Sequence, residues 1–201
     1  MKTQMRFQKI LSFVTLVIAA LCFVYALAFL TGGLGNVHYY KWLNSETDKI
    51  NATNFTVAAQ SFVSTLVIFS IVFILVVVTL FITASNKRRN YYVTNYVSIA
   101  LVAVCALAIA LYIIISVSNI MNLFYNDIAW EAGTNGGLNY ADQFNPAYPI
   151  DKSPANFILG YILGVVVILT AVVHVLNLVW KVKLMKGEKA LLQGGLVKEV
   201  A

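Results

Sequence analysis

Four long stretches of this sequence contain no Asp, Glu, Lys or Arg: approximately Ile10–Leu30, Phe62–Ala84, Val97–Ile120 and Phe157–Trp180. Each is long enough to cross a hydrocarbon core of about 30 Å as a helix, which takes roughly 20 residues. Hydrophobic residues make up 60 % of the 201 residues and charged residues 11 %, which is too little charge for the surface of a water-soluble domain of this size. We therefore expect an all-α integral membrane protein, a bundle of four transmembrane helices in a single transmembrane domain over residues 1–201.

The basic residues predict how the chain is oriented. Eleven of the 14 Lys and Arg residues lie at the amino end, in the short connection between the second and third stretches, or in the tail 181–201; the exceptions are Lys41, Lys49 and Lys152. The positive-inside rule then places both termini in the cytoplasm and two longer loops, approximately 31–61 and 121–156, outside. The net charge of +6 is thus a signal of topology and not of nucleic-acid binding. The plasma membrane is the location we expect.

The first stretch also resembles a secretory signal peptide, because a basic amino end precedes it and Ala26-Leu27-Ala28 resembles a cleavage site. Its 21 residues exceed the usual apolar region of about 7–15 residues. We therefore expect it to be retained as the first transmembrane helix.

Small residues follow one face of two of the predicted helices. They recur three or four positions apart in the first helix, and the fourth helix contains a GxxxG motif with an alanine on the same side. The residues are Ser12, Thr15, Ala19, Cys22 and Ala26, and Gly160, Gly164 and Ala171. Such faces let helix backbones approach closely in lipid. They pack inside the bundle or form an interface with a partner subunit or a second copy, and the sequence leaves both readings open.

His174 is the only strongly ionisable side chain within the four stretches. With Thr170, Asn177 and Lys181 it falls within an arc of about 60° on the fourth helix. An ionisable group inside a membrane is a candidate functional site, although the interpretation we favour is a neutral histidine that donates a hydrogen bond to Asn177 or to a neighbouring helix. A second polar stripe, Tyr112, Ser116 and Asn119, either lines an outward-facing vestibule or marks the point where the third helix meets water.

The predicted outer loops combine aromatic and acidic residues. The aromatic candidates for an outer binding surface are Tyr39, Tyr40, Trp42, Trp130, Tyr140 and Phe144. Loops of about 30 residues are longer than helix connections require and often carry binding function, whereas Tyr and Trp at membrane ends also serve as interfacial anchors. Asn51 and Asn54 begin glycosylation sequons on the same side.

The tail after residue 180 could extend the fourth helix. Its residues Lys183, Lys186 and Lys189 would attract anionic lipids by about 1 kcal/mol each. Topology alone explains these lysines, so the sequence indicates no specific lipid site.

The four-span layout resembles that of claudins and tetraspanins. Neither outer loop contains a cysteine, however, so the motifs that define those groups are missing and the sequence assigns no family.

No pattern points to a metal, a cofactor or a catalytic group, and we expect no enzyme. The leading hypothesis is a non-enzymatic accessory or scaffold subunit that binds other membrane proteins or copies of itself. The alternative is a small transporter or homo-oligomeric channel that uses the polar stripe around His174, and a membrane enzyme comes third.

Overall fold

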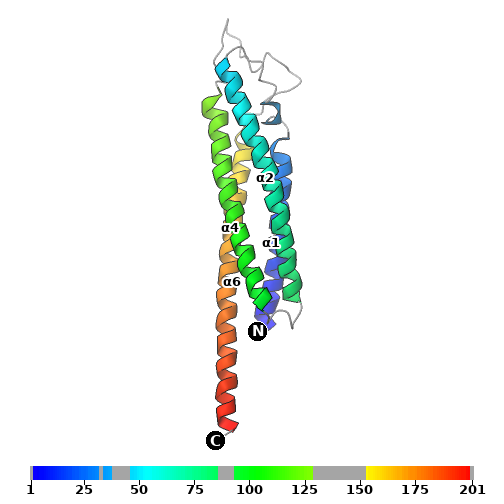
Figure 1. The fold of residues 1–201 in the computed structure, drawn as a ribbon, viewed down its shortest axis with the longest axis vertical. Coiled ribbons are helices and arrows are strands. Elements are labelled where there is room, and N and C mark those ends of the chain that lie inside the picture. The colour runs from blue at the N-terminus through cyan, green and yellow to red at the C-terminus, as the bar shows by residue number, and fades with distance from the viewer. Residues whose placement is uncertain (1, 32–33, 38–45, 86–92, 129–152, 200–201) are drawn as a thin grey trace. The chain divides into compact units, whose positions relative to one another are not determined.

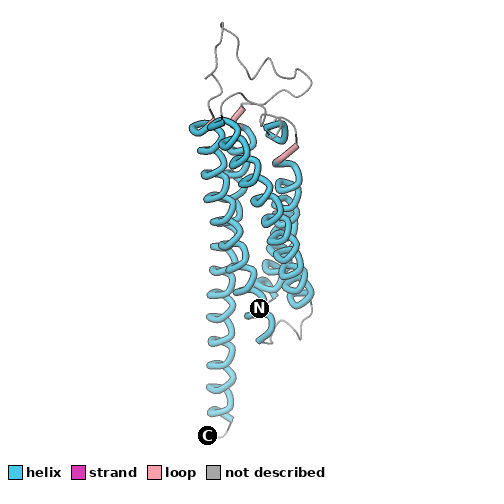
Figure 2. Tube along the Cα trace, turned by 45° about the horizontal axis from the view of Figure 1, so that its top comes forward, coloured by secondary structure: helices cyan, strands magenta, loops and turns pink. Residues whose placement is uncertain are grey.

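The computed structural model describes residues 2–31, 34–37, 46–85, 93–128 and 153–199, and their regular structure is entirely helical (Figures 1 and 2). The elements are α1 (Lys2–Phe29), α2 (Glu46–Ser85), α4 (Val93–Asn122), the short π-helix η2 (Leu123–Asp127) and α6 (Ala155–Glu199). The four long helices are apolar enough over sufficient length to cross a membrane. The prediction of an all-helical, multi-pass membrane protein is confirmed to that extent.

Helix α2 differs from the sequence-based expectation. We predicted a loop over residues 31–61, but α2 begins at Glu46, so the second half of that segment is helical. Ala52, Phe55 and Ala59 continue the spacing of the membrane stretch at intervals of three or four residues, and all three are fully buried. The polar residues between them reduce the mean hydropathy of the segment, but they leave this apolar face intact.

Helix α6 begins as expected and ends later. The Ser153 hydroxyl oxygen accepts a hydrogen bond from the backbone N–H of Ala155 at 3.3 Å, so Ser153 caps the helix and Pro154 occupies its first turn. The helix then continues for 45 residues to Glu199, far beyond the predicted end at Trp180. Ala, Leu, Lys and Glu, which favour helices, are frequent in that extension.

The chain divides into two compact units, and each long helix runs through both. Unit 1 consists of Met1–Ala19, Val72–Ala108 and Val166–Ala201, and unit 2 of Ala20–Ile71 and Ile109–Val165. In both units the helices expose Leu, Ile and Val side chains on their outer faces, as a lipid environment requires. Their interiors differ: that of unit 1 contains a cluster of polar side chains among apolar ones such as Phe73 and Leu80, and that of unit 2 contains many aromatic rings.

Aromatic rings fill the interior of unit 2. The centroids of Phe29 and Phe62 are 4.9 Å apart, and the ring of Phe62 stacks on that of Tyr112 at 5.9 Å. The Tyr25 hydroxyl donates to the carbonyl oxygen of Asn156 at 2.9 Å. A Cβ atom at Gly160 would collide with that hydroxyl, so only glycine allows α6 to approach Tyr25 this closely.

Candidate functional site

The interior of unit 1 contains a cluster of polar side chains from all four long helices, which we call the polar centre. Each of these side chains is at most 7 % exposed. They are Gln4, Gln8, Ser12 and Thr15 of α1, Thr83 of α2, Asn95 of α4, and Thr170, His174, Asn177 and Lys181 of α6. Since an unsatisfied polar group in hydrocarbon costs several kcal/mol, the hydrogen bonds of this cluster decide whether it stabilises the fold.

Helix α1 contributes its residues at intervals of four, four and three, which places them on one face. The Ser12 hydroxyl donates to the carbonyl oxygen of Gln8 at 2.7 Å, and the Thr15 hydroxyl donates to that of Leu11 at 2.8 Å. Ser12 and Thr15 were predicted from the sequence, whereas Gln4 and Gln8 were missed, because they precede the apolar stretch that begins at Ile10. The signal was present, since both glutamines extend the small-residue stripe towards the amino end at the same spacing.

Lys181 fixes the direction of the hydrogen bonds around Asn95. A lysine side chain can only donate here, so the atom of Asn95 that faces the Lys181 Nζ atom must be the carbonyl oxygen Oδ1. The Asn95 amide nitrogen then points to Thr83 and donates to its Oγ1 at 2.9 Å. The Thr83 hydroxyl in turn donates to the carbonyl oxygen of Leu80 at 2.9 Å. Lys181 also lies 4.6 Å from the ring centroid of Tyr96.

The same oxygen of Asn95 also accepts a hydrogen bond from α1, which begins a second series of hydrogen bonds. Gln8 Nε2 donates to Asn95 Oδ1 at 3.0 Å, which leaves Gln8 Oε1 to accept from Gln4 Nε2 at 3.1 Å. Gln4 Nε2 also donates to Asn177 Oδ1 at 3.0 Å. These bonds connect α1, α4 and α6, and the Thr83 branch adds α2, so that Asn95 is the residue through which the four helices are joined.

His174 bonds to α1 through Thr15, whose Oγ1 atom lies 2.8 Å from His174 Nε2. The single hydroxyl hydrogen of Thr15 is directed at Leu11, so Nε2–H is the donor and Nδ1 is left as an acceptor. Three buried atoms of the polar centre have no hydrogen-bond partner: His174 Nδ1, Gln4 Oε1 and Asn177 Nδ2. Buried polar atoms are usually paired in proteins, so each of these three has capacity for a further hydrogen bond.

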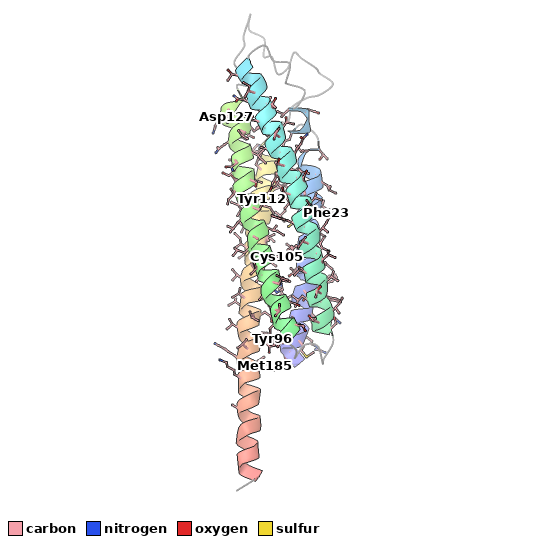
Figure 3. All side chains as sticks on the ribbon, in the orientation of Figure 1. Phe23, Tyr96, Cys105, Tyr112, Asp127 and Met185 are labelled. Atoms are coloured by element: carbon pink, nitrogen blue, oxygen red, sulfur yellow. The ribbon has the colours of Figure 1, made fainter. Side chains whose placement is uncertain are left out.

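The remaining polar candidates lie in different environments. Thr170 is buried, and its hydroxyl donates to its own helix at Val166. Tyr112, which is labelled in Figure 3, belongs to unit 2, and its ring packs against those of Phe62 and Phe69. Ser116 is half-buried and Asn119 is exposed, so the second stripe does not share one environment.

The small-residue stripes lie in the interior. Ser12, Thr15, Ala19, Cys22 and Ala26 are all fully buried. A Cβ atom at Gly164 would come within 2.6 Å of Ile114, and Ala171 is 6 % exposed. In the structure these residues therefore contact other parts of the same chain.

The six aromatic candidates for an outer surface, Tyr39, Tyr40, Trp42, Trp130, Tyr140 and Phe144, lie outside the described residues. Of the two sequon asparagines, Asn54 is exposed, whereas Asn51 is half-buried and its side chain donates to the carbonyl oxygen of Asp127. Among the residues that the structure describes, no group of three or more His, Cys, Asp or Glu side chains is placed to hold a metal ion.

Comparisons of the chain with protein-family models, with curated proteins and with solved structures found no match.

Proposed function

We propose that the protein is a non-enzymatic accessory or scaffold subunit of a membrane complex, and that it presents the end of α6 to a partner protein in the cytoplasm. The observation that carries this proposal is the length of α6. Its 45 residues extend over about 67 Å at 1.5 Å per residue, more than twice the length needed to cross a membrane. Figure 1 shows its last part, which we call the arm (residues 182–199), continuing past the amino-terminal end of α1 within unit 1.

The polar centre lies at the base of the arm. On α6, His174, Asn177 and Lys181 are spaced by about one turn, and each forms a hydrogen bond to another helix of unit 1. These bonds fix the rotation and direction of α6 just before the arm begins. A helix held in this way presents the same face of the arm at all times, which reduces the entropy lost when a partner binds.

The arm is amphipathic by helical register. Leu184, Met185, Leu191 and Leu192 occupy positions within about 120° on one side, among which Glu188 also falls, and Lys183, Lys186 and Lys189 occupy the opposite side. In proteins most of the stability of a helix comes from packing of its apolar face and not from helix propensity. A partner that covers the apolar side would stabilise it, as helix-in-groove partners do.

The second candidate function is transport or channel activity through the polar centre. It is favoured by the three buried atoms without partners, His174 Nδ1, Gln4 Oε1 and Asn177 Nδ2. The aromatic interior of unit 2 argues against a path through a single chain, because rings at centroid distances of 4.9–6.3 Å fill the space that a polar path would need. A path formed between several copies of the chain would not pass through these rings. This form of the hypothesis predicts that His174→Ala alters flux in reconstituted vesicles.

The scaffold proposal is tested by site-specific photo-crosslinking in native membranes. A photoreactive residue at Met185, on the apolar side of the arm, is expected to cross-link one defined partner in near-stoichiometric yield. The matched control is the same residue at Ala190, which is exposed and lies on the lysine side by register; it should cross-link that partner weakly. Equal labelling at both positions, or a particle that contains this 22.2 kDa chain alone after mild extraction, would overturn the proposal.

A further inference from the structure

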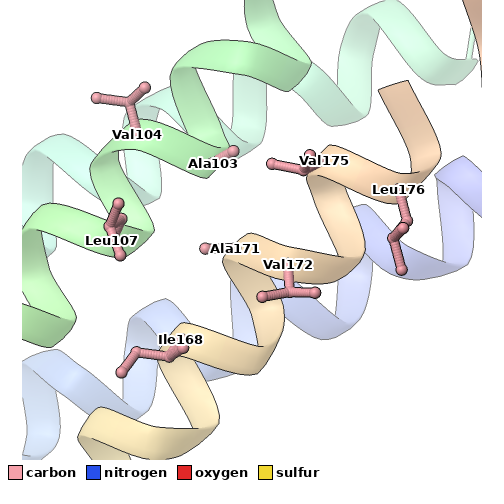
Figure 4. A pocket seen from close by; sticks show the side chains of 8 residues that line it. All are labelled: Ala103, Val104, Leu107, Ile168, Ala171, Val172, Val175 and Leu176. Atoms are coloured by element: carbon pink, nitrogen blue, oxygen red, sulfur yellow. The ribbon is translucent and has the colours of Figure 1, made fainter. Parts of the chain in front are cut away.

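An open apolar groove runs between α4 and α6 on the outer surface of unit 1 (Figure 4). Its volume is about 290 Å³, and every side chain that lines it is a hydrocarbon. Ala103 of α4 and Ala171 of α6 lie at its floor with 7 % and 6 % exposure, and larger side chains such as Leu107 and Val175 form its walls. The groove exists because alanines occupy positions at which larger side chains would fill the space between the two helices.

The groove is short. On α6 it extends from Ile168 to Leu176, which is about 12 Å along the helix axis and less than half of a hydrocarbon core of about 30 Å. A transmembrane helix would contact its neighbour over a longer distance than this. The length fits instead within the half of the core that one lipid leaflet provides.

Two lysines continue the line of the groove on α6. By helical register Lys183 and Lys186 share the face of Val172 and Val175, and both are exposed. Lys183 follows Leu176 by about 10 Å along the axis, in the region where the charge-free part of α6 has ended. Lys181 does not belong to this exposed pair, because its side chain is buried and donates to Asn95.

We propose that this groove binds one acyl chain of an anionic phospholipid whose phosphate lies against Lys183 and Lys186. The hydrocarbon walls hold the chain by dispersion contacts, and the two ammonium groups select a negative headgroup, since each lysine near a membrane surface contributes to the attraction of anionic lipids. The lysines that topology alone explained thus have a second role, which depends on their alignment with the groove. This inference does not rest on the proposed function, because it needs no partner protein.

The test uses the full chain reconstituted in phosphatidylcholine nanodiscs with a small fraction of a photoactivatable lipid that carries a diazirine in its acyl chain. The phosphatidylglycerol form of this probe is expected to label peptides that contain Leu107 and Val175 in preference to the lipid-facing Leu75 of α2, which is 62 % exposed. The double variant Lys183→Gln/Lys186→Gln should reduce this labelling roughly 10- to 30-fold. Lys9→Gln is the matched control, because Lys9 lies in unit 1 over the ring of Phe81 of α2, and it should leave the labelling unchanged.

A second variant tests the groove itself. Ala171→Leu fills the floor and should abolish labelling while Lys183 and Lys186 remain. Three results would overturn the proposal: equal labelling by the phosphatidylcholine and phosphatidylglycerol probes, labelling of Leu75 as strong as that of the groove, or disulfide-linked dimers of Val172→Cys, which would show a second copy in the groove.

Discussion

Asn95 is the residue on which the polar centre depends. Its amide oxygen accepts from two helices and its amide nitrogen donates to a third, so one side chain connects α4 to α1, α6 and α2. Lys181 sets the orientation of this amide, and through it the orientation of Gln8 and Gln4. A single lysine therefore determines which atom of each amide in this series donates a hydrogen bond and which atom accepts one.

Replacement of Asn95 should therefore destabilise the protein more than loss of one hydrogen bond would. Interhelical hydrogen bonds in membranes average about 0.6 kcal/mol, and three are lost at once, so we expect Asn95→Ala to cost about 2 kcal/mol. Ser98→Ala provides the control: Ser98 is buried on the same helix, but its hydroxyl bonds only to the α4 backbone at Thr94. Thermal unfolding in mild detergent measures both, and similar midpoints for the two variants would contradict the central role of Asn95.

At the scale of elements, two of the glycines of α6, Gly160 and Gly187, have opposite roles. Gly160 faces the Tyr25 hydroxyl and Val117, whereas a Cβ atom at Gly187 would meet nothing within 4 Å. One glycine permits close packing in unit 2, and the other only weakens the helix at the start of the arm.

Alanine at these two positions should change stability in opposite directions. Gly160→Ala forces Tyr25 away from Asn156 and should cost about 1–3 kcal/mol, the usual range for overpacking. Gly187→Ala should stabilise the helix by up to about 1 kcal/mol. Denaturation of both variants against the unmodified chain tests this, and a stable Gly160→Ala protein would show that α6 shifts to accommodate the methyl group.

A proline at Gly187 should kink the arm at the preceding turn, residues 183–187, which contains Met185. It removes a backbone hydrogen bond and costs about 3 kcal/mol locally, so Gly187→Pro should abolish cross-linking from Met185. The unfolding midpoint of the membrane part should not change, because Lys181, the last residue of the polar centre on α6, precedes the substituted position. Retained cross-linking would mean that the partner recognises the arm without a continuous helix.

The helices were predictable from the sequence to the extent that hydrophobicity specified them. Four charge-free stretches are sufficient to locate four spans, but Glu46–Gln60 and the arm are helical for reasons that mean hydropathy does not capture.

His174, Asn177 and Thr170 were identified because they interrupt an apolar stretch. Gln8 and Asn95 were missed, because each lies at the edge of a span, where polar residues are common. Their importance comes from pairing across 87 residues of sequence, which no local pattern reveals.

At the scale of the whole molecule, the positive-inside rule predicts that the arm is cytoplasmic. This orientation is the premise of the scaffold proposal, since an arm outside the cell would meet different partners. It follows from the excess of Lys and Arg at both termini and near Lys87.

Single cysteines test this orientation in intact cells. Asp127 at the end of η2 and Lys186 in the arm are both exposed, and a background with Cys22→Ala and Cys105→Ala removes the two native thiols. A membrane-impermeant maleimide should label Asp127→Cys in intact cells, and Lys186→Cys only after permeabilisation, because the expected orientation places the two positions on opposite sides of the membrane. The reverse pattern would place the arm outside, and the proposed cytoplasmic partner would then have to be abandoned even if the arm itself binds a protein.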